Sequence, residues 1–114
     1  MIEINIAREY SKTPGGRYIK EGKYSGEDFR ERFLKPRYLE AQESDDILIV
    51  NLDGGYGYGS SFLEEAFGGL IRSLKNVDLE RIRIVSEEEP QLSEDIKKYM
   101  SDALKNEGEN KCEK

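Results

Sequence analysis

The chain has 114 residues, a formal net charge of -6 and a charged fraction of 37%. This length fits one domain, and the overall acidity argues against a binder of nucleic acid or of anionic membranes, which needs a basic surface. The chain contains no histidine, which excludes a serine–histidine catalytic system and a zinc site of cysteine and histidine within it.

The N-terminal part of the chain predicts two strands. Isoleucines alternate with polar residues from Ile2 to Ile6, which is the period-2 pattern of a strand with one buried face. A turn signal follows at Pro14, with two glycines after it. We therefore expect residues 17–22 to form a second strand, antiparallel to the first as a hairpin or at an edge.

A helix is predicted to begin at Ser25, whose hydroxyl can cap the free N–H groups of the first turn, with Asp28 three residues later. Apolar residues at helical spacing mark its buried face: Phe29, Phe33 and Leu34. Because proline lacks an N–H group, Pro36 predicts a break or kink near Lys35, and the helical pattern ends at about residue 43.

The middle of the chain carries the strongest strand pattern. The run Ile47–Leu52 is almost continuously apolar, which is typical of a central strand. A helix is predicted from Ser61 to about residue 75, followed by a strand over 81–86. The last helix is predicted from Ser93, with its apolar residues four apart.

These elements predict an α/β fold: a small single-layer mixed β-sheet with helices mainly on one face. Each strand–helix–strand unit should cross over right-handedly into a parallel pair. We expect one domain over residues 1–105. Residues 106–114 are polar and form a predicted flexible tail, because they cannot bury enough apolar area to offset chain entropy.

The stretch from Asp53 to Ser61, "DGGYGYGSS", is the most unusual part of the chain. Its simplest interpretation is a turn followed by a capping box, in which Ser61 and Glu64 cap a new helix. A glycine loop before a helix can also bind a nucleotide or small anion, with Arg17 or Arg72 as counter-charge. However, the P-loop and dinucleotide fingerprints are absent from this stretch.

Two further expectations concern chemistry and location. Asp53 with Glu64 or Glu65 could hold a divalent metal, since hard cations prefer oxygen ligands. We nevertheless expect no enzyme activity, no cofactor and no metal. The single cysteine, Cys112, and the absence of a run of transmembrane length predict a cytoplasmic protein.

The span "ILIVNLDGGYGYGSSFLEEAFGGL" resembles the STAS fold of anti-sigma factor antagonists, which carry a serine pair at a helix start. More closely, the chain is similar to a bacterial STAS-like family of unknown function. Its members share the patterns Ser-Gly-Glu-x-Phe-Arg and Ser-Ser-Phe-Leu-x-Glu-x-Phe-Gly-Gly. The resemblance implies that a partner kinase of the histidine-kinase-like ATPase class phosphorylates Ser61 of the pair Ser60-Ser61.

The resemblance and the loop together predict a regulatory domain that docks on a protein partner, with no DNA, RNA or membrane bound. Tyrosines are common at protein interfaces, although here they could equally pack over the strand ends. The expected partner-binding residues are Asp53, Tyr56, Gly57, Tyr58, Gly59, Glu64 and Glu65.

Overall fold

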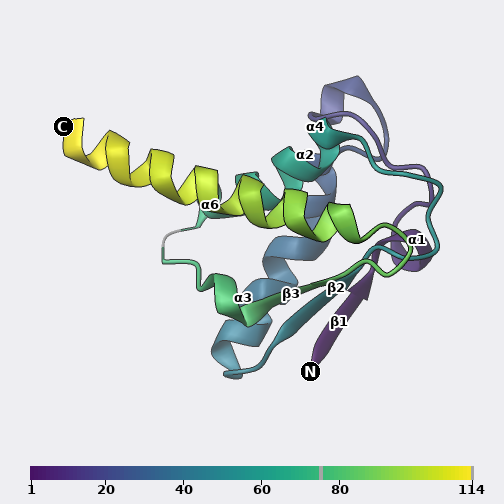
Figure 1. Cartoon of the computed structure of the whole chain (residues 1–114), viewed down its shortest axis with the longest axis horizontal. Coiled ribbons are helices and arrows are strands. Elements are labelled where there is room, and N and C mark those ends of the chain that lie inside the picture. The colour runs from purple at the N-terminus through teal and green to yellow at the C-terminus, as the bar shows by residue number, and fades with distance from the viewer. Residues whose placement is uncertain (75, 114) are drawn as a thin grey trace.

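The computed structural model describes residues 1–74 and 76–113, and the side chains of residues up to 105 among these. Three strands form one parallel sheet in the order β1 (Ile2–Asn5), β2 (Leu48–Asn51) and β3 (Ile82–Val85). Ile4 lies opposite Val50, and Val50 lies opposite Ile84. Figure 1 shows the strands side by side, with α6 starting near the end of β3 and running back above them. The prediction that 47–52 is a central strand is confirmed.

Helices cover one face of the sheet. The first long helix runs through α2 (Gly26–Phe29), a π-helical turn η2 (Arg30–Leu34) and α3 (Lys35–Glu43). The second, which we call the serine helix, runs through α4 (Ser60–Leu63), a π-helical turn η3 (Glu64–Gly68) and α5 (Gly69–Ser73). The remaining helices are α1 (Ile6–Glu9), η1 (Ile19–Glu21), η4 (Leu79–Arg81) and α6 (Pro90–Glu113).

Burial alternates along β1 as the sequence predicts, and it alternates along β2 as well, although the apolar run there favours burial on both faces. Leu48 and Val50 are buried beneath the helices, whereas Ile49 between them is only partly buried. On the same side of the sheet as Ile49, Glu3 and Arg83 are exposed. The small α/β sheet with helices mainly on one face is therefore confirmed.

The predicted second strand over 17–22 is wrong, and with it the antiparallel pairing. This segment contains the single 3₁₀ turn η1. Its N–H groups bond locally instead of to a neighbouring strand. The carboxylate of Glu21 accepts from the N–H groups of Arg17 and Tyr18, and the N–H groups of Glu21 and Gly22 donate to backbone oxygens of the same turn. No side chain is buried from residue 15 to residue 23, so nothing anchors the segment to a sheet.

The predicted start of the first helix is confirmed, because the hydroxyl of Ser25 accepts a hydrogen bond of 3.1 Å from the N–H of Asp28. The chain does not break at Pro36. The backbone stays helical, and the distortion that proline requires takes the form of the π-helical turn just before it.

The last helix begins at Pro90, earlier than the predicted Ser93, because proline suits the first turn of a helix. Ile96 and Met100 are buried as predicted, while Leu104 is partly exposed and Ala103 is buried instead. The flexible tail predicted over 106–114 falls where side chains lie outside the described residues, and it stays a prediction.

Candidate functional site

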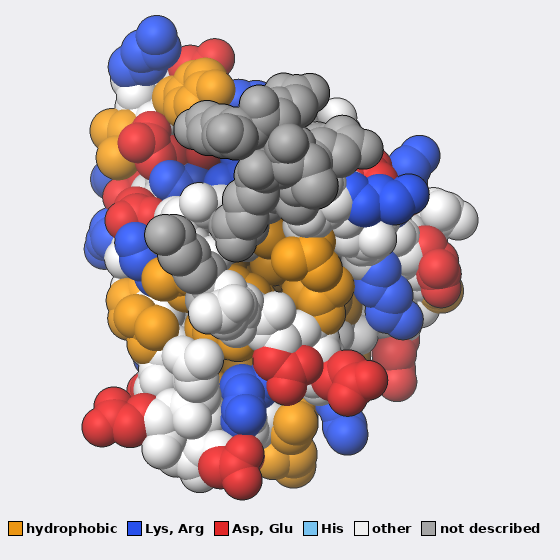
Figure 2. All heavy atoms as spheres, turned by 90° about the vertical axis from the view of Figure 1, so that its left-hand side faces the viewer, with side chains coloured by type: hydrophobic (Ala, Val, Ile, Leu, Met, Phe, Trp, Pro, Cys, Tyr) orange, Lys and Arg blue, Asp and Glu red, His pale blue; other side chains and the backbone are white. Residues whose placement is uncertain are grey.

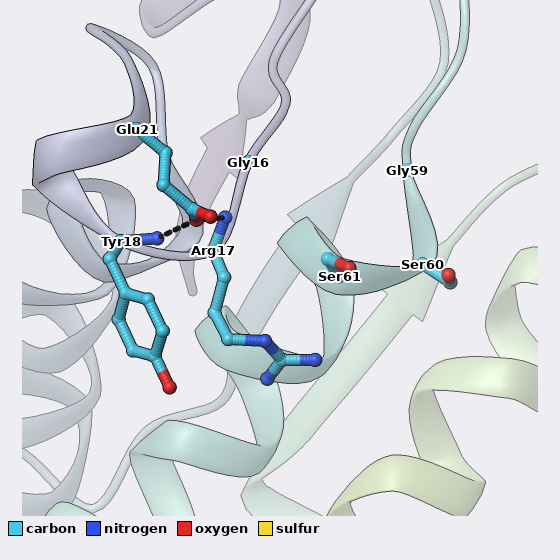
Figure 3. Close-up of a pocket in the computed structure, with 7 residues that line it drawn as sticks. All are labelled: Gly16, Arg17, Tyr18, Glu21, Gly59, Ser60 and Ser61. Carbon is cyan, nitrogen blue, oxygen red and sulfur yellow. Dashed lines mark hydrogen bonds between the residues drawn. The ribbon is translucent and has the colours of Figure 1, made fainter.

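The serine pair opens onto a cavity of about 580 Å³ at the start of the serine helix (Figure 3). The cavity has two walls that are distant in sequence. One is the helix start, and the other is residues 15–23, which we call the arginine loop. The lining residues are Gly16, Arg17, Tyr18, Glu21, Gly59, Ser60 and Ser61.

Neither serine caps the serine helix, so the predicted capping box of Ser61 and Glu64 is wrong. The N-cap position falls on Gly59, whose extended backbone places Ser60 and Ser61 already inside the first turn, and no side chain makes a capping hydrogen bond there. Both serines are exposed. Their hydroxyl groups therefore have no role in starting the helix.

The carboxylate of Glu64 forms ion pairs within the chain. Glu64 accepts a hydrogen bond of 2.7 Å from Arg72 and another from Arg17 of the arginine loop. The hydrogen bond from Arg72 is the main cause that lowers the pKa of Glu64, and the bond from Arg17 adds to it. Glu64 is thus charged and paired at neutral pH.

Glu65 forms the most buried ion pair that we find in the described residues. Its carboxylate accepts a hydrogen bond of 2.5 Å from Arg30, and each side chain is only 11% exposed. The same guanidinium group also donates to the backbone oxygen of Glu65 at 3.0 Å. Because Arg17 reaches the carboxylate as well, at 3.3 Å, Glu65 ties the first long helix and the arginine loop to the serine helix.

Two glycines inside the serine helix make room for these ion pairs. A Cβ atom on Gly68 would lie 2.5 Å from a carboxylate oxygen of Glu64, and one on Gly69 would overlap the guanidinium group of Arg30. Glycine inside a helix costs about 1 kcal/mol relative to alanine. At both positions, glycine avoids displacing the end of a charged side chain from its ion pair.

Asp53 links two loops at the carboxyl ends of β2 and β3. Its carboxylate accepts hydrogen bonds from the backbone N–H groups of Glu87 and Glu88, at 3.2 and 3.0 Å. In return, the Glu88 carboxylate accepts from the N–H of Gly54 at 2.8 Å. Asp53 therefore has a structural role that the sequence did not indicate.

The two tyrosines of the glycine loop lie in different environments. Tyr58 is partly buried against Phe62, and its hydroxyl donates to the backbone oxygen of Leu52 at 2.8 Å. Burial, helped by the negative charge of Asp53, raises the pKa of Tyr58 to about 12. Tyr56 is 80% exposed, so it is the tyrosine that projects from the surface.

The acidic side chains of the hypothetical metal site do not come together in the structure. Asp53 binds backbone N–H groups, while Glu64 and Glu65 bind arginines. Within the residues that the structure describes, no group of three or more acidic, cysteine or histidine side chains is arranged to hold a metal ion.

A second, smaller cavity of about 190 Å³ lies between β3 and α6. Its apolar lining includes Leu79, Ile82, Ile84 and Met100. Figure 2 shows a face on which hydrophobic side chains gather in a central area beside acidic and basic ones. A cavity of this composition suits an apolar side chain better than a phosphate or a nucleotide.

The sequence did not point to most of the arginine loop. The sequence places Gly16 in a predicted turn and Arg17, Tyr18 and Glu21 in a predicted strand, with Arg17 also a possible counter-charge. The turn signal at Pro14 marks a loop here. A local turn signal cannot show that this loop faces Ser61, which lies 44 positions beyond Arg17 in the sequence.

A small parallel sheet covered on one face by helices is consistent with a STAS-like domain. Residues 25–92 match the family model described as "STAS-like domain of unknown function (DUF4325)". The chain belongs to this family. Comparison with curated proteins and with solved structures found no match. The matched segment contains the whole serine helix, whereas the arginine loop precedes it.

The helices of the described residues include none that is both long enough and apolar enough to cross a membrane.

The lowered pKa of Glu64 predicts a pH dependence of stability. A carboxylate whose pKa is lower in the folded state stabilises the fold above its ordinary pKa of 4.5, and this contribution is lost as the pH falls. We expect Glu64→Gln to cost about 1 kcal/mol at pH 7 and less at pH 3. Urea denaturation of both proteins at a series of pH values measures this difference. An equal loss at both pH values would contradict the assignment.

Proposed function

We propose that this protein is a regulatory domain that docks on a protein partner through the surface around the serine pair. We further propose that the partner is a kinase of the histidine-kinase-like ATPase class and that Ser61 accepts a phosphoryl group from it. The observation that carries the proposal is the position of the serines. Both are exposed at the mouth of a cavity, and neither caps the helix that it opens.

Phosphoryl transfer to Ser61 requires only an accessible hydroxyl group from this chain. The Oγ atom of Ser61 attacks the γ-phosphorus of ATP, its proton passes to a base of the kinase, and the bond to the bridging oxygen breaks to release ADP. The chain contributes an accessible hydroxyl group, while the kinase contributes ATP, the base and the phosphate-binding residues. The start of the serine helix favours the added negative charge, because its free N–H groups carry a partial positive charge.

The docking surface that we propose is narrower than the sequence predicted. Tyr56 supplies exposed aromatic area, and a Cβ atom on Gly57 or Gly59 would have no atom within 4 Å, so a partner can approach the backbone there. Tyr18 of the arginine loop is 43% exposed beside the same cavity. The other predicted residues make contacts within the chain, so we leave them out of the proposed surface: Asp53, Tyr58, Glu64 and Glu65.

Binding of a nucleotide or small anion by the loop itself is the less favoured function. The guanidinium group of Arg17 would be its counter-charge, but Glu64 and Glu65 already neutralise that group. The carboxylate of Glu21 also lines the cavity and would repel a free phosphate, which, unlike a phosphate attached to Ser61, would have to be held by binding alone.

Intact-mass measurement tests the phosphorylation. The chain is incubated with ATP and purified ATPases of this class from its own cell. We expect one added phosphate in the wild-type protein and in Ser60→Ala, and none in Ser61→Ala. Ser60→Ala is the matched control, because it alters the neighbouring hydroxyl of the same helical turn. A phosphate that persists in Ser61→Ala, or none in the wild type with any kinase, would overturn the assignment.

A further inference from the structure

The arginine loop is attached to the domain mainly by polar contacts. No side chain from residue 15 to residue 23 is buried, and Tyr18 and Ile19 are 43% and 55% exposed. Backbone hydrogen bonds from Gly26 and Glu27 to the oxygens of Gly16 and Arg17 hold one side. Segments with few buried apolar contacts open at low free-energy cost. A change at Arg17 can therefore move this loop.

Arg17 can leave its present partners without exposing an unpaired buried charge. Glu64 would keep its hydrogen bond of 2.7 Å to Arg72, and Glu65 would keep its bond of 2.5 Å to Arg30. The side chain of Arg17 is itself 31% exposed. The main cost of breaking a buried pair, an uncompensated charge, is thus absent here.

Ser61 lies one turn before the two glutamates on the same side of the serine helix. Residues three and four apart share a helix face, and helical side chains lean toward the N-terminus. Figure 3 shows Ser61 on the side of the helix that faces Arg17, while Ser60 points away from it. The separation between Ser61 and Glu65 is about 5–6 Å along the axis, which the long arginine side chain can span.

We propose that phosphorylation of Ser61 moves Arg17 from Glu64 and Glu65 to the phosphate, and so fastens the arginine loop over the serine pair. This proposal rests on Ser61 being the phosphorylated residue. A phosphate carries a charge of about -1.5 to -2 and three acceptor oxygens, and it suits the two-pronged geometry of guanidinium better than a shared carboxylate. The phosphate also repels the nearby carboxylate of Glu64. This repulsion favours the same move of Arg17.

The move of Arg17 to the phosphate gives phosphorylation of Ser61 a structural effect in addition to the added charge. Tyr18 follows Arg17 directly and lines the same cavity, so its exposed ring moves with the loop. The phosphorylated protein then presents a closed cavity, and the unmodified protein presents an open one. A partner that contacts Tyr18 and the serine pair would distinguish the two forms by shape as well as by charge.

Amide hydrogen exchange of the full chain tests the proposal. Phosphoserine is inserted at position 61 during translation with an expanded genetic code, so no kinase is needed. We expect exchange in residues 15–23 to slow about tenfold relative to the unmodified protein, because the bond from Arg17 to a doubly charged phosphate is stronger than its present bonds to two carboxylates that it shares with Arg72 and Arg30. Phosphoserine at position 60 is the matched control and should slow it much less.

Substitution of Arg17 distinguishes the proposed move of Arg17 to the phosphate from a general effect of the added charge. In the protein with phosphoserine at 61, Arg17→Gln should abolish the slowing and Arg17→Lys should retain part of it. Exchange of the β2 amides verifies that each variant is folded. Equal loop exchange with and without phosphate, or slowing that persists in Arg17→Gln, would overturn the proposal. Neither result depends on a kinase, so the mass measurement remains a separate test of Ser61 as the natural acceptor.

Discussion

Replacing Glu65 with alanine is expected to lower the free energy of unfolding by about 2–3 kcal/mol, because a buried guanidinium group loses one of its two carboxylate partners. Arg30, whose side chain is only 11% exposed, would keep its hydrogen bond of 2.8 Å to the exposed carboxylate of Glu31 but lose its buried partner. It would also lose the 2.5 Å hydrogen bond that orients it against the serine helix. Urea denaturation followed by circular dichroism measures the loss.

Arg32→Ala is the matched control for this effect. Arg32 comes from the same helix and also forms an ion pair, with Asp28 at 3.1 Å, but its side chain is 63% exposed. Exposed pairs contribute about 0–1 kcal/mol, so this variant should stay close to wild type. If Glu65→Ala cost no more than Arg32→Ala, burial of the Arg30–Glu65 pair would not be what stabilises the contact between the helices.

Gly26→Ala is expected to destabilise the protein by about 1–3 kcal/mol, because it forces extra volume into a closed contact. A Cβ atom at this position would lie 2.5 Å from the backbone oxygen of Phe62, which cannot turn aside as a side chain could. The preference of helices for alanine would offset only about 1 kcal/mol of the clash. The midpoint of urea denaturation should therefore fall.

Gly15→Ala provides the comparison for Gly26. A Cβ atom on Gly15 would have no atom within 4 Å, so the substitution should be neutral or slightly stabilising through a less flexible unfolded chain. Equal stability of the Gly26→Ala and wild-type proteins would show that the two helices can separate without cost.

These contacts give a physical meaning to the two sequence patterns on which the resemblance to the STAS-like family rests. Ser-Gly-Glu-x-Phe-Arg supplies the cap Ser25, the closely packed Gly26 and the charge of Arg30. In the second pattern, Glu65 and the glycine pair complete the same ion-pair contact. Most of both patterns therefore describes how two helices pack. The serine pair is the part that packing leaves unexplained, which is why we place the function there.

The sequence alone predicted the elements that depend on local patterns. The alternation of Ile2, Ile4 and Ile6, the apolar run over 47–52 and the cap at Ser25 indicated an α/β sheet with helices on one face, and the family patterns indicated a STAS-like domain. Periodicity and capping act over a few residues, so they can be recognised without knowing the fold. The predicted strand over 17–22 is wrong because the N–H groups of this segment bond to nearby carboxylates and to backbone oxygens of the same turn.

Only the tertiary structure decided what surrounds the serine pair. Arg17 meets Glu64 across 47 positions of sequence, Arg30 meets Glu65 across 35, and Asp53 meets the backbone of Glu88 across 35. No local pattern records such contacts, because they arise when the sheet brings together the ends of strands and helices that are far apart in the chain. The sequence thus determined the fold and the presence of two serines at a helix start. Their exposure, and the arginine that faces them, follow from how the helices pack.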